Sequence, residues 1–205
     1  MKILIVDDHG VVREGLSRLL SAHFDVELSE APSVDSALET YKRERPNVVI
    51  LDLNLEGPGG LEMLRRLHIS DNQAKVIIFS MHHEPVYAVR ALRAGARGYV
   101  SKSAPVEELL MAVRTVASGG QYVDRDLASR IATSHASNED PLQVLSLREV
   151  EILRLLGQGK SMTAISEGLG IAYKTVANIC TQMKVKLGVD RTADLIRLAV
   201  ETLKP

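Results

Sequence analysis

Apolar residues in the first half of the chain follow two alternating patterns. Short runs rich in β-branched residues recur five times, and between them apolar residues repeat every three or four positions. The short runs, which we predict to be strands, are residues 3–6, 26–28, 48–51, 76–79 and 98–100. The segments between and after them, which we predict to be helices, are residues 11–20, 34–41, 61–67, 86–92 and 106–116.

This alternation predicts an α/β fold in which helices cover both faces of a doubly wound, flavodoxin-like, five-stranded parallel sheet. Residues 3–6, 48–51 and 76–79 are almost entirely apolar. Strands that are covered on both faces need that composition. Residues 118–122, Ser-Gly-Gly-Gln-Tyr, break the pattern, so we assign residues 1–118 to a first domain.

The remainder of the chain has only helical spacing. A short helix near residues 124–133 and a polar segment at 134–141 indicate an interdomain linker over residues 119–144. Residues 145–205 form the expected second domain, which is all-α. Its four predicted helices are residues 147–157, 161–168, 172–187 and 191–203. The apolar spacing of the last helix serves either a dimer contact or core packing.

Composition and charge narrow the class of protein. The chain is 45% hydrophobic and 25% charged, which is typical of a soluble globular protein. No apolar run approaches the roughly 20 residues of a membrane span, so we expect a cytoplasmic protein without a membrane partner. A single cysteine, Cys180, cannot form an internal disulfide. Residues 146–205 carry nine basic and six acidic residues, a weak indication of a polyanionic partner.

Polar residues follow the predicted strands and form a chemically coherent set. These residues are Asp7, Asp8, Asp52, Ser80, Ser101 and Lys102. Because the carboxyl ends of parallel strands meet at one edge of the sheet, we expect them to converge in a crevice. Three carboxylates repel one another and require a cation, and an all-oxygen cluster suits Mg²⁺. A single aspartate at a strand end is usually a cap or turn residue, so the joint occurrence favours a site.

The set has the chemistry that an aspartyl phosphate requires. Mg²⁺ and Lys102 would neutralise the charge on the phosphoryl oxygens during transfer. Asp52 would act as the nucleophile, and Ser80 would hydrogen-bond the attached phosphoryl group. An aspartate-nucleophile phosphatase of the haloacid dehalogenase kind is an alternative. It needs an Asp-x-Asp spacing at the first strand, whereas Asp7 and Asp8 are adjacent, so we do not expect an enzyme.

Residues 1–117 resemble the receiver domain of bacterial response regulators. The matching motifs are Ile3-Leu-Ile-Val-Asp-Asp-His9, Val48-Val-Ile-Leu-Asp-Leu53, Ser80-Met-His82 and Ala94-Gly-Ala-Arg-Gly-Tyr-Val-Ser-Lys102. The resemblance implies that Asp52 is the phosphoacceptor and that a sensor histidine kinase donates the phosphoryl group. The Mg²⁺ ligands that it implies are Asp8 directly, Asp7 through water, Asp52, and the backbone carbonyl of Asn54.

The resemblance also places Tyr99 at the family's switch aromatic, which moves with Ser80 on phosphorylation. The alternative interpretation of Tyr99 is a half-buried aromatic on an edge strand. Glu56 stands where relatives often have a proline. It would tune the lifetime of the phosphate or lie inert in solvent.

Helix 172–187 is amphipathic and is preceded by a short helix and a Leu-Gly-Ile turn. Its apolar stripe runs through Val176, either Ile179 or Cys180, Met183 and Leu187. This arrangement predicts a helix-turn-helix, whose second helix enters the DNA major groove.

The segment resembles a LuxR-type helix-turn-helix, on Gly159-Lys-Ser161 and Lys186-Leu-Gly-Val189. The whole chain therefore resembles the NarL/FixJ subfamily of response regulators. The resemblance implies phosphorylation-controlled transcription regulation, double-stranded DNA as a partner and a homodimer when phosphorylated.

The candidate DNA contacts lie along this predicted recognition helix. They are Lys174, Thr175, Ala177, Asn178, Thr181, Gln182, Lys184 and Lys186. Ala177 and Ile179 stand where relatives commonly have lysine and histidine, and the loss of one phosphate contact lowers the salt slope by about one. A second interpretation therefore stays open, in which the C-terminal domain acts mainly through protein–protein contacts. We expect Cys180 to pack in the core rather than to sense redox state.

Overall fold

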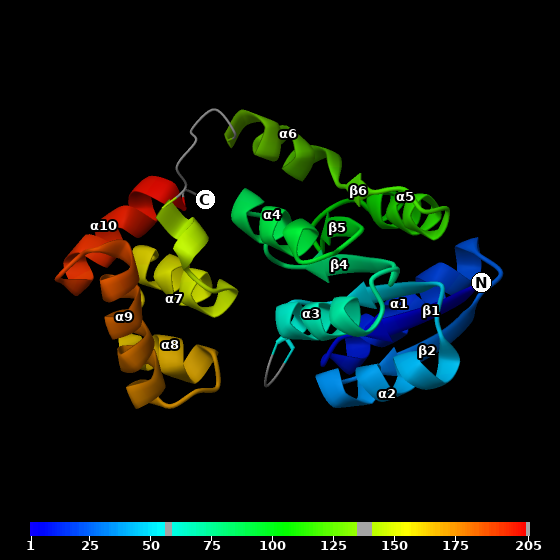
Figure 1. Ribbon diagram of the computed structural model, residues 1–205, viewed down its shortest axis with the longest axis horizontal. Helices are drawn as coiled ribbons and strands as arrows, with labels where there is room; N and C mark the ends of the chain where they lie inside the picture. Colours follow the sequence, from blue (N-terminus) through cyan, green and yellow to red (C-terminus); the bar gives the residue numbers. More distant parts are fainter. Residues whose placement is uncertain (56–58, 135–140, 204–205) are drawn as a thin grey trace. The chain divides into compact units, whose positions relative to one another are not determined.

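The computed structural model of the protein describes residues 1–55, 59–134 and 141–203 (Figure 1). Glu56 and most of the predicted linker segment 134–141 lie outside the described residues. The chain divides into two compact units, residues 1–136 and 137–205. The short helix that we predicted within the linker region packs in the first of these units.

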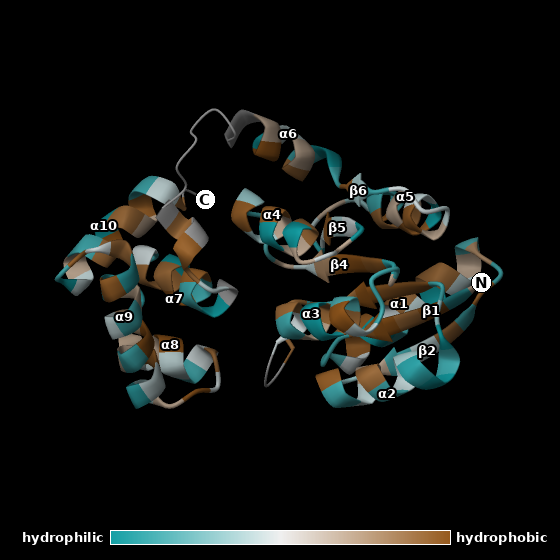
Figure 2. Cartoon of the chain, viewed as in Figure 1, coloured by the Kyte–Doolittle hydropathy of each residue, from teal (hydrophilic) through white to brown (hydrophobic). Residues whose placement is uncertain are grey.

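A six-stranded, all-parallel sheet forms the centre of the first unit, with the order β2-β1-β3-β4-β5-β6. The strands are β1 (Lys2–Val6), β2 (Glu27–Ala31), β3 (Val48–Leu51), β4 (Val76–Ser80), β5 (Gly98–Ser101) and β6 (Tyr122–Val123). The doubly wound parallel architecture is confirmed, and Figure 2 shows the hydrophobic character of its central strands.

The expected number of five strands is corrected to six. In β6, Tyr122 and Val123 pair with Gly98 and Tyr99 of β5. Two residues are too few to show an alternating pattern, so this strand could not be predicted from the sequence. It forms because β5 would otherwise leave its backbone groups unpaired at the edge of the sheet.

Helices cover both faces of this sheet. They are α1 (Gly10–His23), α2 (Val34–Glu44), α3 (Gly60–Ser70), α4 (Pro85–Arg93), α5 (Val106–Ala117) and α6 (Arg125–Ser134). Side chains of α1 and α5 share a core with Ile3, Ile50 and Ile77 on one face. Leu4 and Val49 point to the opposite face and are fully buried. Right-handed crossovers place α2, α3 and α4 there.

The second unit consists of helices throughout its described residues. It comprises the 3₁₀ turn η1 (Pro141–Val144) and helices α7 (Leu147–Gly157), α8 (Met162–Gly168), α9 (Tyr173–Leu187) and α10 (Thr192–Thr202). The four predicted helices are confirmed to within one or two residues at each end. Gly157 lets α7 approach α10 closely, because an added Cβ there would lie 2.8 Å from the Cβ of Ala199. Among the described helices, none is long and apolar enough to cross a membrane.

Candidate functional site

Two buried aspartates lie side by side at the carboxyl edge of the sheet. Asp7 follows β1 and is 2% exposed, and Asp52 follows β3 and is 3% exposed. The two strands are neighbours, and the Asp52 amide donates to the Val6 carbonyl at 2.9 Å. The strands end here because each apolar run stops at a carboxylate. The convergence expected from strand-end chemistry is therefore present for these two residues.

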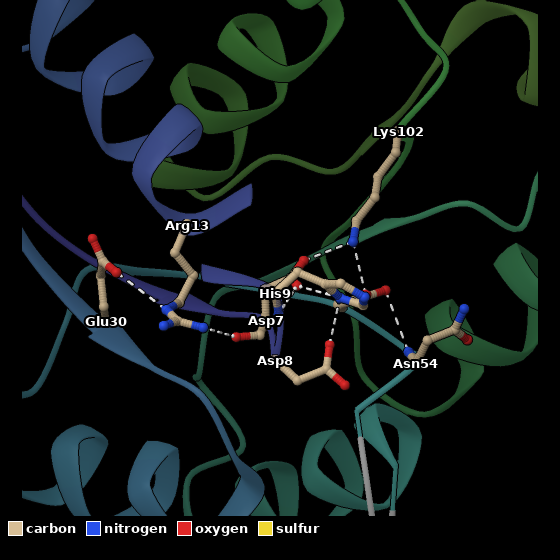
Figure 3. A network of polar contacts seen from close by, with 8 residues as sticks. Asp7, Asp8, His9, Arg13, Glu30, Asn54 and Lys102 are labelled. Carbon is tan, nitrogen blue, oxygen red and sulfur yellow. Dashed lines mark hydrogen bonds and ion pairs between the residues drawn. The ribbon is translucent and has the colours of Figure 1, made fainter. Parts of the chain in front are cut away.

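Lys102, which follows β5, bridges the two aspartates (Figure 3). Its Nζ donates to Asp7 Oδ2 at 2.6 Å and to Asp52 Oδ2 at 2.7 Å. Burial lowers the pKa of the Lys102 ammonium, but its contacts with Asp52 and Asp7 outweigh burial and raise the pKa above its ordinary value. Lys102 therefore stays positively charged and offsets part of the charge of the two carboxylates.

The acidic cluster has the donor atoms of a hard-cation site. Ligand atoms of Asp7, Asp8, His9 and Asp52 all lie within 4.8 Å of one another. Asp8 Oδ1 is buried and, although it lies 2.7 Å from His9 Nδ1, it accepts no hydrogen bond from the described residues. A buried carboxylate oxygen that accepts no hydrogen bond is well suited to act as a metal ligand. The oxygen-rich set fits Mg²⁺, and we did not anticipate His9 beside it.

Asn54 and His82 connect the pocket to the loops around it. The Asn54 amide donates to Asp52 Oδ1 at 3.3 Å, and the Asn54 side-chain oxygen lies 2.8 Å from His82 Nε2. The His82 ring is buried and stacks on Tyr87, with ring centroids 4.1 Å apart. His82 belongs to the motif Ser80-Met-His82 that we identified in the sequence. Its contact with Asn54 could not be predicted from local sequence patterns, because the two residues are 28 positions apart.

Ser80 and Tyr99, the residues predicted to switch, are both completely buried. The Ser80 hydroxyl accepts from the His82 amide at 3.4 Å, and the Tyr99 hydroxyl donates to the His82 carbonyl at 2.8 Å. Burial raises the pKa of the Tyr99 phenol well above its usual range, and Tyr87 and Glu84 add to this effect. The alternative of a half-buried edge aromatic is wrong, because β6 pairs with the outer side of β5.

The exposed face of α9 carries most of the candidate DNA contacts. Its exposed members are Lys174, Thr175, Asn178, Thr181, Gln182 and Lys186, whereas Ala177 and Lys184 are partly buried. Lys174, Asn178 and Thr181 recur at helical spacing and therefore share one face. The opposite face packs in the core through Val176, Cys180 and Met183.

Cys180 is the buried member of the apolar stripe, whereas Ile179 is only partly buried. Burial raises the pKa of the Cys180 thiol. A thiol with a raised pKa is a poor nucleophile, which agrees with the packing role that we predicted.

Lys186 has a partner inside its own unit. Its Nζ donates to both carboxylate oxygens of Glu149, each at 2.8 Å, and Glu149 is 4% exposed. Glu149 and Ser146 also form the capping box of α7. Burial by itself raises the pKa of Glu149, but the hydrogen bonds from Lys186 and Ser146 outweigh it and lower the pKa. Our sequence interpretation gave Lys186 a DNA contact and did not identify Glu149 as its partner.

Comparison with known proteins agrees with both halves of this description. Residues 3–114 match the response regulator receiver domain, and residues 143–199 match the bacterial regulatory proteins of the luxR family. The chain is 37% identical over 199 residues to the methanol utilization control regulatory protein MoxX of Paracoccus denitrificans, covering 96% of this chain and 89% of that protein. It is 38% identical over 206 residues to the transcriptional activator protein ExaE of Pseudomonas putida, covering 98% and 96%.

A solved structure shares the fold along the whole chain. RcsB from Salmonella enterica serovar Typhimurium, bound to promoter rprA in the presence of the phosphomimetic BeF₃⁻, superposes with a TM-score of 0.66, covers 98% of each chain and is 22% identical. The resemblance seen in the sequence is confirmed on these grounds. The chain belongs to the two-component response regulators, in which a receiver domain is joined to a LuxR-type helix-turn-helix DNA-binding domain.

Proposed function

We propose that this protein regulates transcription and is switched by phosphorylation of Asp52, with a sensor histidine kinase as the phosphoryl donor. The observation that carries the proposal is the bridge from Lys102 to Asp7 and Asp52. It places one fixed positive charge directly against a buried carboxylate, within a cluster suited to a divalent cation. A purely structural ion pair does not need the further carboxylate of Asp8.

The residues that would hold Mg²⁺ are Asp7, Asp8, Asp52 and the backbone carbonyl of Asn54. When bound, the ion supplies positive charge to the phosphoryl oxygens. Asp52 attacks phosphorus with one carboxylate oxygen while the bond from phosphorus to the donor's imidazole nitrogen breaks, and the imidazole keeps that electron pair. Lys102 stabilises the negative charge on the transferring group.

Ser80 and Tyr99 are the residues that would respond to the new phosphoryl group. Ser80 ends β4 and is buried within the same edge of the sheet, so its hydroxyl can rotate to donate to a phosphoryl oxygen. The Tyr99 hydroxyl holds the loop after β4 through the His82 carbonyl. A shift of that loop would release or reposition the Tyr99 ring and alter the surface formed by α4, β5 and α5.

We assign double-stranded DNA to the exposed face of α9. ExaE is a transcriptional activator and RcsB binds a promoter, which supports the same output here. Asn178 can read adenine with two hydrogen bonds, and Thr181 can contact a thymine methyl group. Lys174 and Lys184 would contact phosphates, and Gln182 and Thr175 would flank them. Lys186 is bonded to Glu149, which makes it less available to a phosphate.

The acceptor assignment is tested by Asp52→Asn. We expect the wild-type chain to gain one acid-labile phosphate from acetyl phosphate and Mg²⁺, and Asp52→Asn to gain none, because an amide cannot act as this nucleophile. Phosphate-affinity electrophoresis measures both. Asp35→Asn, which changes an exposed aspartate of α2, should label like the wild type. Full labelling of Asp52→Asn would falsify the assignment.

The output is tested separately by selecting genomic fragments with and without acetyl phosphate. We expect phosphorylation to enrich a small set of fragments that share a two-fold symmetric element. Binding should weaken steeply as salt rises, because phosphate contacts release counterions. If the labelled protein enriches no fragments, DNA is not its target and the C-terminal unit acts through protein contacts instead.

A further inference from the structure

Asp124 is a buried carboxylate that belongs neither to the acidic cluster nor to the helix-turn-helix. It lies between β6 and α6 and is 3% exposed. Its Oδ2 accepts a hydrogen bond from the Ser101 amide at 2.9 Å, and its Oδ1 accepts one from the Leu127 amide at 3.0 Å. One side chain therefore ties the end of β5 to the beginning of α6.

The first of these bonds reaches the pocket through the backbone. Ser101 is the last residue of β5 and directly precedes Lys102, whose own amide donates to the Ser80 carbonyl at 2.8 Å. The Asp124 amide also donates to the Tyr99 carbonyl at 3.1 Å. The strand that carries Tyr99 and leads into Lys102 is thus held by Asp124 at two places.

The second bond caps α6. An aspartate before the first turn of a helix accepts from a free amide there and stabilises the helix. Leu127 is 1% exposed, and α6 contacts α4; Figure 1 shows the two helices beside each other. In the sequence, α6 ends at Ser134 and the second unit begins at residue 137. It is therefore the described helix nearest in sequence to the DNA-binding unit.

Helix capping alone does not account for both oxygens of Asp124. A cap needs one acceptor, and serine or asparagine would supply it. The second oxygen accepts a hydrogen bond from the Ser101 amide. Because β6 ends at Val123, that strand provides no backbone carbonyl for this amide. Without Asp124 this buried amide would lose its hydrogen-bond partner, which is unfavourable.

We propose that Asp124 is a positioning residue that couples the phosphorylation pocket to α6. A phosphoryl group on Asp52 draws the Lys102 ammonium away from Asp7, and the end of β5 follows. Because Ser101 and Tyr99 are bonded to Asp124, the first turn of α6 moves with them. The inference rests on the proposed phosphorylation of Asp52.

Hydrogen exchange in the full-length chain tests the coupling, with acetyl phosphate and Mg²⁺ as the probe. In the wild type, we expect the amides of residues 125–134 to exchange several-fold faster once Asp52 is labelled. Asp124→Ser keeps an oxygen for the Leu127 amide but lacks the second oxygen for Ser101. We expect this variant to label more slowly and, at equal labelling, to show no phosphate-dependent change in α6.

Two further variants separate coupling from folding. Asp126→Ala changes an exposed aspartate of the same helical turn and should respond like the wild type. Asp124→Ala should exchange rapidly in α6 with and without phosphate, because the cap is lost as well. A residue with only a structural role would change the baseline exchange and leave the phosphate-dependent difference intact.

Results that contradict the coupling can be told apart from results that contradict the phosphoacceptor assignment. If α6 of Asp124→Ser responds to labelling as strongly as the wild type does, Asp124 does not carry the coupling. If wild-type Asp52 is labelled and α6 exchange does not change, the coupling is wrong while the phosphoacceptor assignment stands. If the wild type takes no phosphate at all, the proposed function fails, and the coupling fails with it.

Discussion

At the scale of single residues, Lys102 occupies the carboxylates that a cation would need. The Lys102 ammonium lies 2.6 Å from Asp7 and 2.7 Å from Asp52, so a cation placed there meets a nearby like charge. Both charges are nevertheless useful when a phosphoryl group arrives, because its oxygens carry more negative charge than the carboxylates do. We therefore expect Lys102 to oppose metal binding and to favour phosphoryl transfer.

Lys102→Met separates these two effects, because methionine keeps an apolar stem and removes the charge. We expect the variant to bind Mg²⁺ several-fold more tightly and to label Asp52 about 100-fold more slowly. Isothermal titration calorimetry measures the first change and acetyl phosphate labelling the second. Lys42→Met, at an exposed position of α2, is the control and should change neither. Weaker Mg²⁺ binding by Lys102→Met would contradict the competition.

Gly60 has a steric role next to Asp52. A Cβ at Gly60 would lie 2.0 Å from the Asp52 carbonyl oxygen, so the start of α3 lies directly against the backbone that carries Asp52. We expect Gly60→Ala to lower the free energy of unfolding by about 2–3 kcal/mol and to slow labelling. Gly15→Ala, where a Cβ meets nothing within 4 Å, should raise it by about 0.5–1 kcal/mol. Urea unfolding measures the stability of both variants. If the two variants are equally stable, α3 does not lie against the Asp52 backbone as closely as described.

At the scale of elements, the bond between Glu149 and Lys186 holds α7 against α9. The folded protein lowers the pKa of Glu149, so this bond stabilises the fold at pH values above the ordinary carboxyl pKa of 4.5. The stabilisation is lost as the pH falls through the lower, folded-state value. The bond therefore has a pH dependence of known sign, and it positions the helix that we assign to DNA.

Lys186→Met tests that sign. At pH 7 we expect the substitution to lower the free energy of unfolding of the second unit by about 1 kcal/mol. This value is small for a hydrogen bond between charged groups, because solvent screens the Lys186 side chain, which is 41% exposed. The difference from the wild type should shrink as the pH falls below 4.5. Hydrogen exchange of α7 reports it, with Lys160→Met, an exposed lysine, as the control. A difference that grows in acid would be incompatible with this account.

At the scale of the whole molecule, α10 has both buried and exposed apolar residues. Leu195 and Ala199 are buried within the second unit, whereas Ile196 and Val200 are 37% and 53% exposed. Core packing, one of our two sequence interpretations of this helix, therefore applies to Leu195 and Ala199, whereas the dimer contact stays a prediction. Ile196 and Val200 lie four residues apart and form one exposed apolar strip.

Val200→Asp tests the dimer assignment of that strip. We expect phosphorylated wild-type protein to bind a symmetric DNA site as a homodimer, and Val200→Asp to bind about ten-fold more weakly because it places a charge in the contact. Mass photometry of the complexes measures stoichiometry and affinity together. Val144→Asp, at another exposed valine of the same unit, is the matched control. A variant that dimerises normally on DNA would exclude this surface.

The sequence by itself determined the alternation of strands and helices from β1 to α5, the four helices of the second unit, and the convergence of Asp7, Asp52 and Lys102. Periodicity is a local property, and parallel strands bring Asp7, Asp52 and Lys102 to one edge whatever the details of packing. The site's chemistry could therefore be predicted from residues far apart in the chain. Helix boundaries in the second unit followed from the same local signals.

Only the tertiary structure decided which side chains meet beyond that edge. In the tertiary structure, β6 pairs at the edge of the sheet, and Cys180 rather than Ile179 is buried in the core. Lys186 also bonds to Glu149, which lies 37 positions away in the sequence. The tertiary structure also placed Asp124 between the pocket and α6. These contacts depend on how helices pack against one another and on which strand edge is left unpaired. Neither property produces a periodic pattern of apolar residues in the sequence.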